Sequence, residues 1–128
     1  MKYIYYNPNP DGAMTGDCVI RAVSKVTERS WDETYVILAS YGFGFKKLMN
    51  TDVVWGAYLK DMGFSRYSLP NSCPHCYTVR DFCRSHPDGT YVLCTGTHVV
   101  AVVDGNYYDS WDSGQEVVAY YWRKDGIL

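Results

Sequence analysis

The stretch that decides the fold is HVVAVVDGNYYDSW, residues 98–111. It holds an apolar run, the dipeptide Asp104-Gly105 and a second run rich in tyrosine. Asp-Gly between two such runs is a strong short-range signal for a β-hairpin with a two-residue loop. The stretch therefore predicts two antiparallel neighbouring strands, His98–Val103 and Asn106–Trp111.

The register of this hairpin decides which carboxylate lies beside His98. With a two-residue loop, Val103 faces Asn106, and His98 and Asp109 become diagonal neighbours on one face, roughly 5–8 Å apart. With a three-residue loop, Asp109 turns to the opposite face and Asp112 lies across from His98. The sequence favours Asp109 as the partner of His98, with Asp112 as the reserve.

Four helices are expected ahead of this hairpin. Apolar residues at three- and four-residue spacing predict the first, and Thr15 or Asp17 would cap it. Two capping-box patterns start the second and the fourth, and Asn50 or Thr51 would cap the third. The expected bounds are Cys18 to about Val26, Ser30 to about Phe43, Asp52–Met62 and Thr78–His86.

Strands are expected at the start of the chain and after Asp88-Gly89. The opening KYIYY is typical of a strand, and a loop over Asn7–Gly12 follows it because two prolines and a glycine break any ladder. The later strands are expected at 90–94, 98–103, 106–111 and 116–122. We therefore expect one α+β domain over residues 1–128, with the N-terminal helices packed on one side of a meandering, antiparallel C-terminal sheet.

Composition and charge narrow the class of partner and the compartment. The 128 residues contain no apolar stretch of membrane-spanning length, and a net charge of −2 with no basic run longer than Lys46-Lys47 disfavours nucleic acid and membrane as partners. No signal-like segment opens the chain, and the five cysteines are an odd number. Both observations favour a reducing, cytoplasmic compartment.

TGDCVIRAV, residues 15–23, places Cys18 at the start of the first expected helix. A helix N-terminus and a neighbouring imidazole both stabilise a thiolate, so Cys18 is a candidate nucleophile; a buried core thiol is the alternative. Of the three histidines, His98 is the one best held by regular structure. In a Cys–His–carboxylate set, the imidazole takes the thiol proton and the carboxylate orients the ring. The backbone N–H of Cys18 would be one donor to the oxyanion.

These residues resemble the papain-like cysteine peptidases, including bacterial and phage relatives. Papain-type enzymes have a cysteine at a helix N-terminus, a strand opening His-Ala-Val and an Asn-Ser-Trp motif on the next strand. Here GDCVIRA, residues 16–22, precedes HVVAVV, residues 98–103, and Asp109-Ser-Trp111, with Asp in place of Asn. GDCVIRA is also locally similar to the ovarian-tumour deubiquitinases. The resemblance implies that Cys18 is the nucleophile, His98 the base and Asp109 the orienting group.

One position departs from the papain pattern. That pattern has a glutamine six residues before the nucleophile, where this chain has Gly12. The oxyanion donor would then be Asn7 or Asn9 from the same loop, or backbone amides alone. Trp111 is expected to cover the His98–Asp109 hydrogen bond from water. The candidates for oxyanion or supporting roles are therefore Asn7, Asn9, Asp17 and Trp111.

The expected activity is hydrolysis of a peptide or isopeptide bond through a thioester, with a protein or peptide substrate and no cofactor. The expected location is the cytoplasm, or the host cytoplasm if the protein is viral. Two alternatives stay open. One is a catalytically silent papain-like module that binds a protein partner through its aromatic surface, and the other is a transglutaminase-like acyltransferase.

A metal site is the competing interpretation of a second cysteine cluster. Cys73-Pro-His-Cys76 is a zinc-type knuckle, and Cys83 and His86 follow it. The second pair falls on an expected helix, where Cys83 shares an apolar face with Phe82 and suits the core equally well. We therefore rank zinc bound by Cys73, Cys76, Cys83 and His86 below a site without metal, and a thioredoxin-like redox role lower still.

Overall fold

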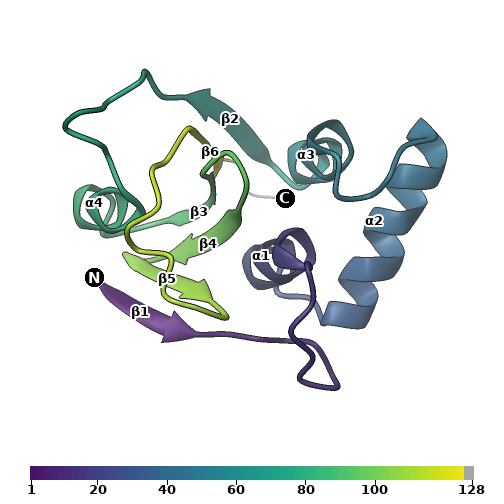
Figure 1. Cartoon of the computed structure of the whole chain (residues 1–128). Coiled ribbons are helices and arrows are strands. Elements are labelled where there is room, and N and C mark those ends of the chain that lie inside the picture. The colour runs from purple at the N-terminus through teal and green to yellow at the C-terminus, as the bar shows by residue number, and fades with distance from the viewer. Residues whose placement is uncertain (126–128) are drawn as a thin grey trace.

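The computed structural model describes residues 1–125 and has a mixed α+β fold (Figure 1). Helices fill most of the first half of the chain and strands most of the second, as expected. The helices of this part are α1 (Cys18–Thr27), α2 (Trp31–Phe45), α3 (Asp52–Asp61) and α4 (Val79–Ser85). The strands are β1 (Lys2–Tyr5), β2 (Phe64–Ser68), β3 (Thr90–Cys94), β4 (Val99–Val103), β5 (Asn106–Asp109) and β6 (Tyr120–Lys124).

The four expected helices are confirmed, and so are both capping boxes. Ser30 caps α2 and Thr78 caps α4, each with its side chain bonded to the backbone N–H three residues on. The expected side-chain cap of α1 is wrong. Asp17 occupies the N-cap position, but its carboxylate makes no capping hydrogen bond because it accepts hydrogen bonds from Arg21 and Trp31 instead.

The hairpin of β4 and β5 has the expected two-residue loop. Val103 pairs with Asn106 and Ala101 with Tyr108. Asp104 and Gly105 have φ angles of 49° and 78°, and a two-residue turn of the type that matches strand twist needs positive φ at both positions. The confirmed register brings Asp109 to the end of the hairpin where His98 enters β4.

The expected meander is wrong for the outer strands. The sheet order is β1-β5-β4-β3-β6-β2, so β6 pairs with β3 rather than with β5, and β1 runs parallel to β5. The strand β2, which was not expected, covers the far edge beside β6. In a sheet of β3, β4 and β5 alone, β3 and β5 would be edge strands with unpaired backbone groups. Strands β6 and β1 pair with these edges, and the segment over residues 110–119 carries the chain from β5 to β6.

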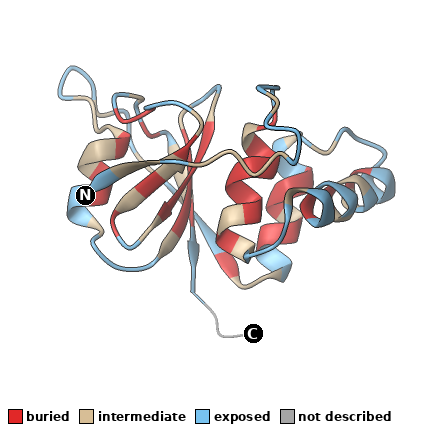
Figure 2. Ribbon diagram, turned by 90° about the horizontal axis from the view of Figure 1, so that it is seen from below, coloured by how far each residue is buried: buried red, intermediate tan, exposed pale blue. Residues whose placement is uncertain are grey.

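The helices lie on both faces of the sheet, which corrects the expectation of a single helical side (Figure 1). Three helices, α1 to α3, share one core with residues such as Val99 and Ala101. The short helix α4 covers the other face, where Phe82 packs with Val100 and Val102. The central strands β3 and β4 are almost wholly buried (Figure 2), and strands that are apolar on both faces need a cover on each.

Two cores therefore hold the central strands, and the α1 core positions the candidate site. Val19, Ile20 and Val23 on α1 are buried against the sheet, which fixes the helix start beside the beginning of β4. Among residues 1–125, no helix is long and apolar enough to cross a membrane.

Candidate active site

Cys18 is the first residue of α1 and is partly exposed. The buried apolar neighbours Val19 and Ile20 anchor the helix start on the sheet. The first N–H groups of any helix lack helical partners, so the Cys18 backbone N–H points out of the helix end and is available to a ligand. The site therefore offers a thiol and a backbone donor from one residue.

His98 lies between the Cys18 thiol and a buried carboxylate. Its Nε2 is 2.6 Å from Oδ2 of Asp109, which is completely buried. Because Nε2 bonds to Asp109, Nδ1 is the ring nitrogen left for the thiol. The order thiol, imidazole, carboxylate that the sequence predicted is present in the folded chain.

The pKa values of Cys18 and His98 shift in opposite directions. Burial raises the pKa of the Cys18 thiol, but hydrogen bonds from the His98 ring and the Val99 backbone, with the charges of His98 and Arg21, lower it below its ordinary value overall. Burial lowers the pKa of His98, but hydrogen bonds to Asp109 and Cys18 outweigh it and raise the pKa to about 9. These shifts favour transfer of the thiol proton to the imidazole.

Four donors surround the carboxylate of Asp109. Oδ2 accepts from His98 and, at 2.6 Å, from the hydroxyl of Ser113. Oδ1 accepts from the Ser110 backbone N–H at 2.8 Å and lies 3.0 Å from Nη2 of Arg21. These contacts hold the carboxylate in one orientation.

The sequence analysis missed Arg21 and Ser113 in this network. A signal for Arg21 was present, because an arginine on the buried stripe of an amphipathic helix needs a charged partner. Asp17, four residues earlier, is one of the two carboxylates that pair with Arg21. Ser113 carried no signal, since it lies in an irregular segment after β5.

Trp111 packs beside His98, with ring centroids 4.8 Å apart. It keeps 44% of its surface exposed, so it shields one side of the imidazole and borders a cleft. This cleft has a volume of about 570 Å³ and reaches from the start of α1 to the start of α3. The side chains that line it include Cys18, His98, Trp111, Asn50, Asp52 and Tyr120.

Neither asparagine of the first loop serves as the expected oxyanion donor. The amide of Asn7 donates to the carbonyls of Gly12 and Ala13 in its own loop. The side-chain oxygen of Asn9 accepts from the backbone of Asp11, and neither asparagine lines the cleft. Short loops satisfy their own backbone first, so of the donors expected from the sequence only the backbone N–H of Cys18 is left for the oxyanion.

Asp112, the reserve orienting group, does not contact His98. Its carboxylate accepts from Arg80 at 3.0 Å and from the Tyr107 hydroxyl. The two-residue hairpin loop sets this difference, because it places Asp109 beside His98.

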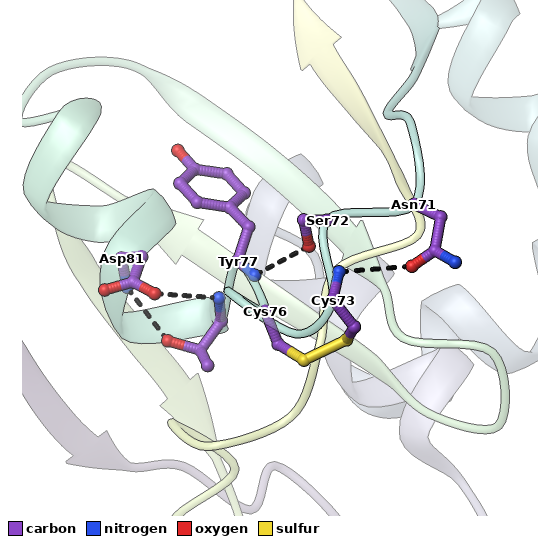
Figure 3. The surroundings of a disulfide bond; sticks show 7 residues. Asn71, Ser72, Cys73, Cys76, Tyr77 and Asp81 are labelled. Atoms are coloured by element: carbon purple, nitrogen blue, oxygen red, sulfur yellow. Dashed lines mark hydrogen bonds between the residues drawn. A yellow bond between two sulfur atoms is a disulfide. The ribbon is translucent and has the colours of Figure 1, made fainter.

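The alternative zinc set is not brought together. Cys73 and Cys76 form a disulfide in the loop before α4 (Figure 3). Cys83 is buried in the core between α4 and the sheet. The His86 ring stacks on the Phe82 ring, with ring centroids 3.8 Å apart. Within residues 1–125 there is no group of three His, Cys, Asp or Glu side chains placed to hold a metal ion. The first pair of expected ligands is a disulfide in a loop, and the second pair lies on and just after α4.

The comparisons with known proteins add no relative. No protein-family model, no curated protein and no solved structure matches this chain. The function is therefore argued from the site alone.

Proposed function

We propose that this protein is a papain-like, cysteine-dependent peptidase or isopeptidase that uses Cys18, His98 and Asp109. The observation that carries the proposal is the position of His98 between a partly exposed thiol and a buried carboxylate. Opposite pKa shifts of a thiol and an imidazole are what nucleophilic cysteine catalysis requires.

In the first half-reaction, the Cys18 proton moves to His98 and the thiolate attacks the substrate carbonyl. The carbon–sulfur bond forms as the carbonyl electrons move to oxygen, and the Cys18 backbone N–H donates to that oxyanion. His98 then gives its proton to the leaving amine. The carbon–nitrogen bond breaks and a thioester remains.

In the second half-reaction, His98 takes a proton from water, which attacks the thioester. The carbon–oxygen bond forms and the carbon–sulfur bond breaks; His98 returns its proton to the Cys18 sulfur, and the carboxylic acid leaves. Asp109, which four donors hold in place, orients the His98 ring and stabilises the imidazolium. All of these steps use side chains and water, so the proposal includes no cofactor.

The proposed substrate is a protein or peptide and the proposed location is the cytoplasm. In that reducing compartment Cys73 and Cys76 would be a dithiol rather than a disulfide. The candidate site would be unaffected, because neither cysteine lines the cleft.

The test measures the pH profile of iodoacetamide labelling at Cys18 by peptide mass spectrometry. We expect an inflection well below that of glutathione in the same buffers, because the thiolate is the reactive form. A fluorogenic peptide library should then release amine with the wild type and not with Cys18→Ala. An ordinary inflection without turnover contradicts the proposal, and products carrying an added primary amine would indicate an acyltransferase instead.

A further inference from the structure

Arg21 is a buried arginine that contacts two carboxylates. It is 4% exposed, and its Nη1 and Nη2 lie 2.8 Å from Asp17 Oδ1 and 3.0 Å from Asp109 Oδ1. Asp17 is 5% exposed and Asp109 is completely buried. Buried charges are costly unless they are paired, so these three side chains are interdependent.

The two carboxylates belong to opposite halves of the candidate site. Asp17 immediately precedes Cys18 and also accepts a hydrogen bond from Trp31 Nε1 at 2.9 Å. Asp109, at the end of β5, holds the His98 ring. The guanidinium of Arg21 therefore links the segment that carries the thiol to the carboxylate that orients the base.

Arg21 supplies a permanently charged donor to Asp109. A guanidinium does not lose its proton in proteins, whereas the Ser110 and Ser113 donors on Asp109 are neutral. The formal charges of Asp17, Arg21 and Asp109 sum to −1, and a net negative group attracts a positive charge on the neighbouring His98 ring.

We propose that Arg21 is a positioning residue for the candidate active site. It holds the Asp109 carboxylate directed at His98, and it links Asp109 to Asp17, the residue before the nucleophile. This inference rests on the proposed function, because it concerns how the same Cys18–His98 pair is held. A lysine cannot replace Arg21, since one ammonium group does not reproduce two parallel N–H donors aimed at two carboxylates.

The test follows the His98 pKa by NMR and the Cys18 labelling profile in the full chain of Arg21→Lys. This variant keeps the charge and removes the geometry. We expect the pKa of His98 to fall by about one unit and Cys18 labelling at pH 6.5 to slow about tenfold. The matched control is Arg80→Lys, because Arg80 also contacts an aspartate at 3.0 Å, Asp112, away from His98; it should leave both values unchanged.

A wild-type His98 pKa in a folded Arg21→Lys variant overturns the inference. If Arg21→Lys does not fold, the double variant Asp17→Asn with Arg21→Gln keeps the net charge of the network and should lower the His98 pKa in the same way; no change there also overturns it. The His98 pKa is measured whether or not Cys18 reacts. Failure of the proposed function, seen in the wild-type labelling profile, is thus distinguishable from failure of this inference.

Discussion

Each face of the sheet carries a helix with a cysteine and a nearby histidine, and the two pairs differ in almost every property. On the α1 face, Cys18 is partly exposed and His98 bonds to buried Asp109. On the α4 face, Cys83 is buried, which raises its pKa to about 11. The His86 ring there stacks on Phe82 and bonds to its carbonyl at 2.9 Å.

The comparison shows that a cysteine and a histidine three residues apart in the sequence do not by themselves form a thiol–imidazole pair. Within residues 1–125 the hydrogen bonds of the His86 ring go to a carbonyl and a hydroxyl, with no carboxylate among them. A buried carboxylate stabilises the imidazolium on the α1 face, and partial exposure gives the thiol access to a substrate. Cys94 makes the same point, since burial raises its pKa to about 12 although it lines the cleft.

The largest effect is expected from exchanging the two histidines in turn for alanine. His98→Ala should slow alkylation of Cys18 at pH 6.5 on the order of 100-fold, because the thiolate loses its proton acceptor. His86→Ala should leave that rate unchanged. Labelling rates from peptide mass spectrometry check both variants, and circular dichroism verifies that each is folded. Equal rates in the two variants would remove the distinction between the faces.

The parts of this site that depend on short-range sequence patterns could be predicted from the sequence. The two-residue Asp104-Gly105 turn fixes the register of β4 and β5. This register decides which side chains share a face of the sheet, and it places Asp109 beside His98. The helix start at Cys18 followed from apolar spacing. Both features are determined by residues close together in the sequence.

The parts that sequence reasoning missed depend on long-range contacts. The pairing of β6 with β3 and β2, and the placement of α4 on the second face, involve segments far apart in the chain. The link from Arg21 to Asp109 also crosses from helix to sheet. The spacing of Cys73 and Cys76 suits a disulfide as well as a zinc knuckle, so spacing could not choose between them.

The second largest effect is expected from replacing the carboxylate that bonds to His98. Asp109→Asn removes the charge behind His98 and should slow Cys18 labelling at pH 6.5 about tenfold, which corresponds to one pKa unit. Asp112→Asn is the matched control, because Asp112 lies in the same segment but bonds to Arg80 and Tyr107. A comparable loss in both variants would mean that the effect comes from the segment as a whole.

The smallest effect concerns how folding stability depends on pH on the α1 face. The pKa of His98 is raised from 6.5 to about 9 in the folded chain, so its stabilising contribution is full below pH 6.5 and is lost as the pH rises toward 9. The lowered pKa of Cys18 acts in the opposite sense, because its contribution grows as the pH rises toward 9. The two contributions offset each other in the wild type.

Cys18→Ala removes the pH-dependent contribution of the thiol to stability and leaves that of His98 unopposed. Its free energy of unfolding should fall by about 1 kcal/mol more than that of the wild type between pH 6.5 and 9, as urea titrations at both pH values would measure. The double variant with His98→Gln should lose this extra slope, and Cys83→Ala, on the other face, should not acquire it. A wild-type slope in Cys18→Ala would contradict the lowered pKa of Cys18, because the thiol would then contribute nothing to the pH dependence of stability.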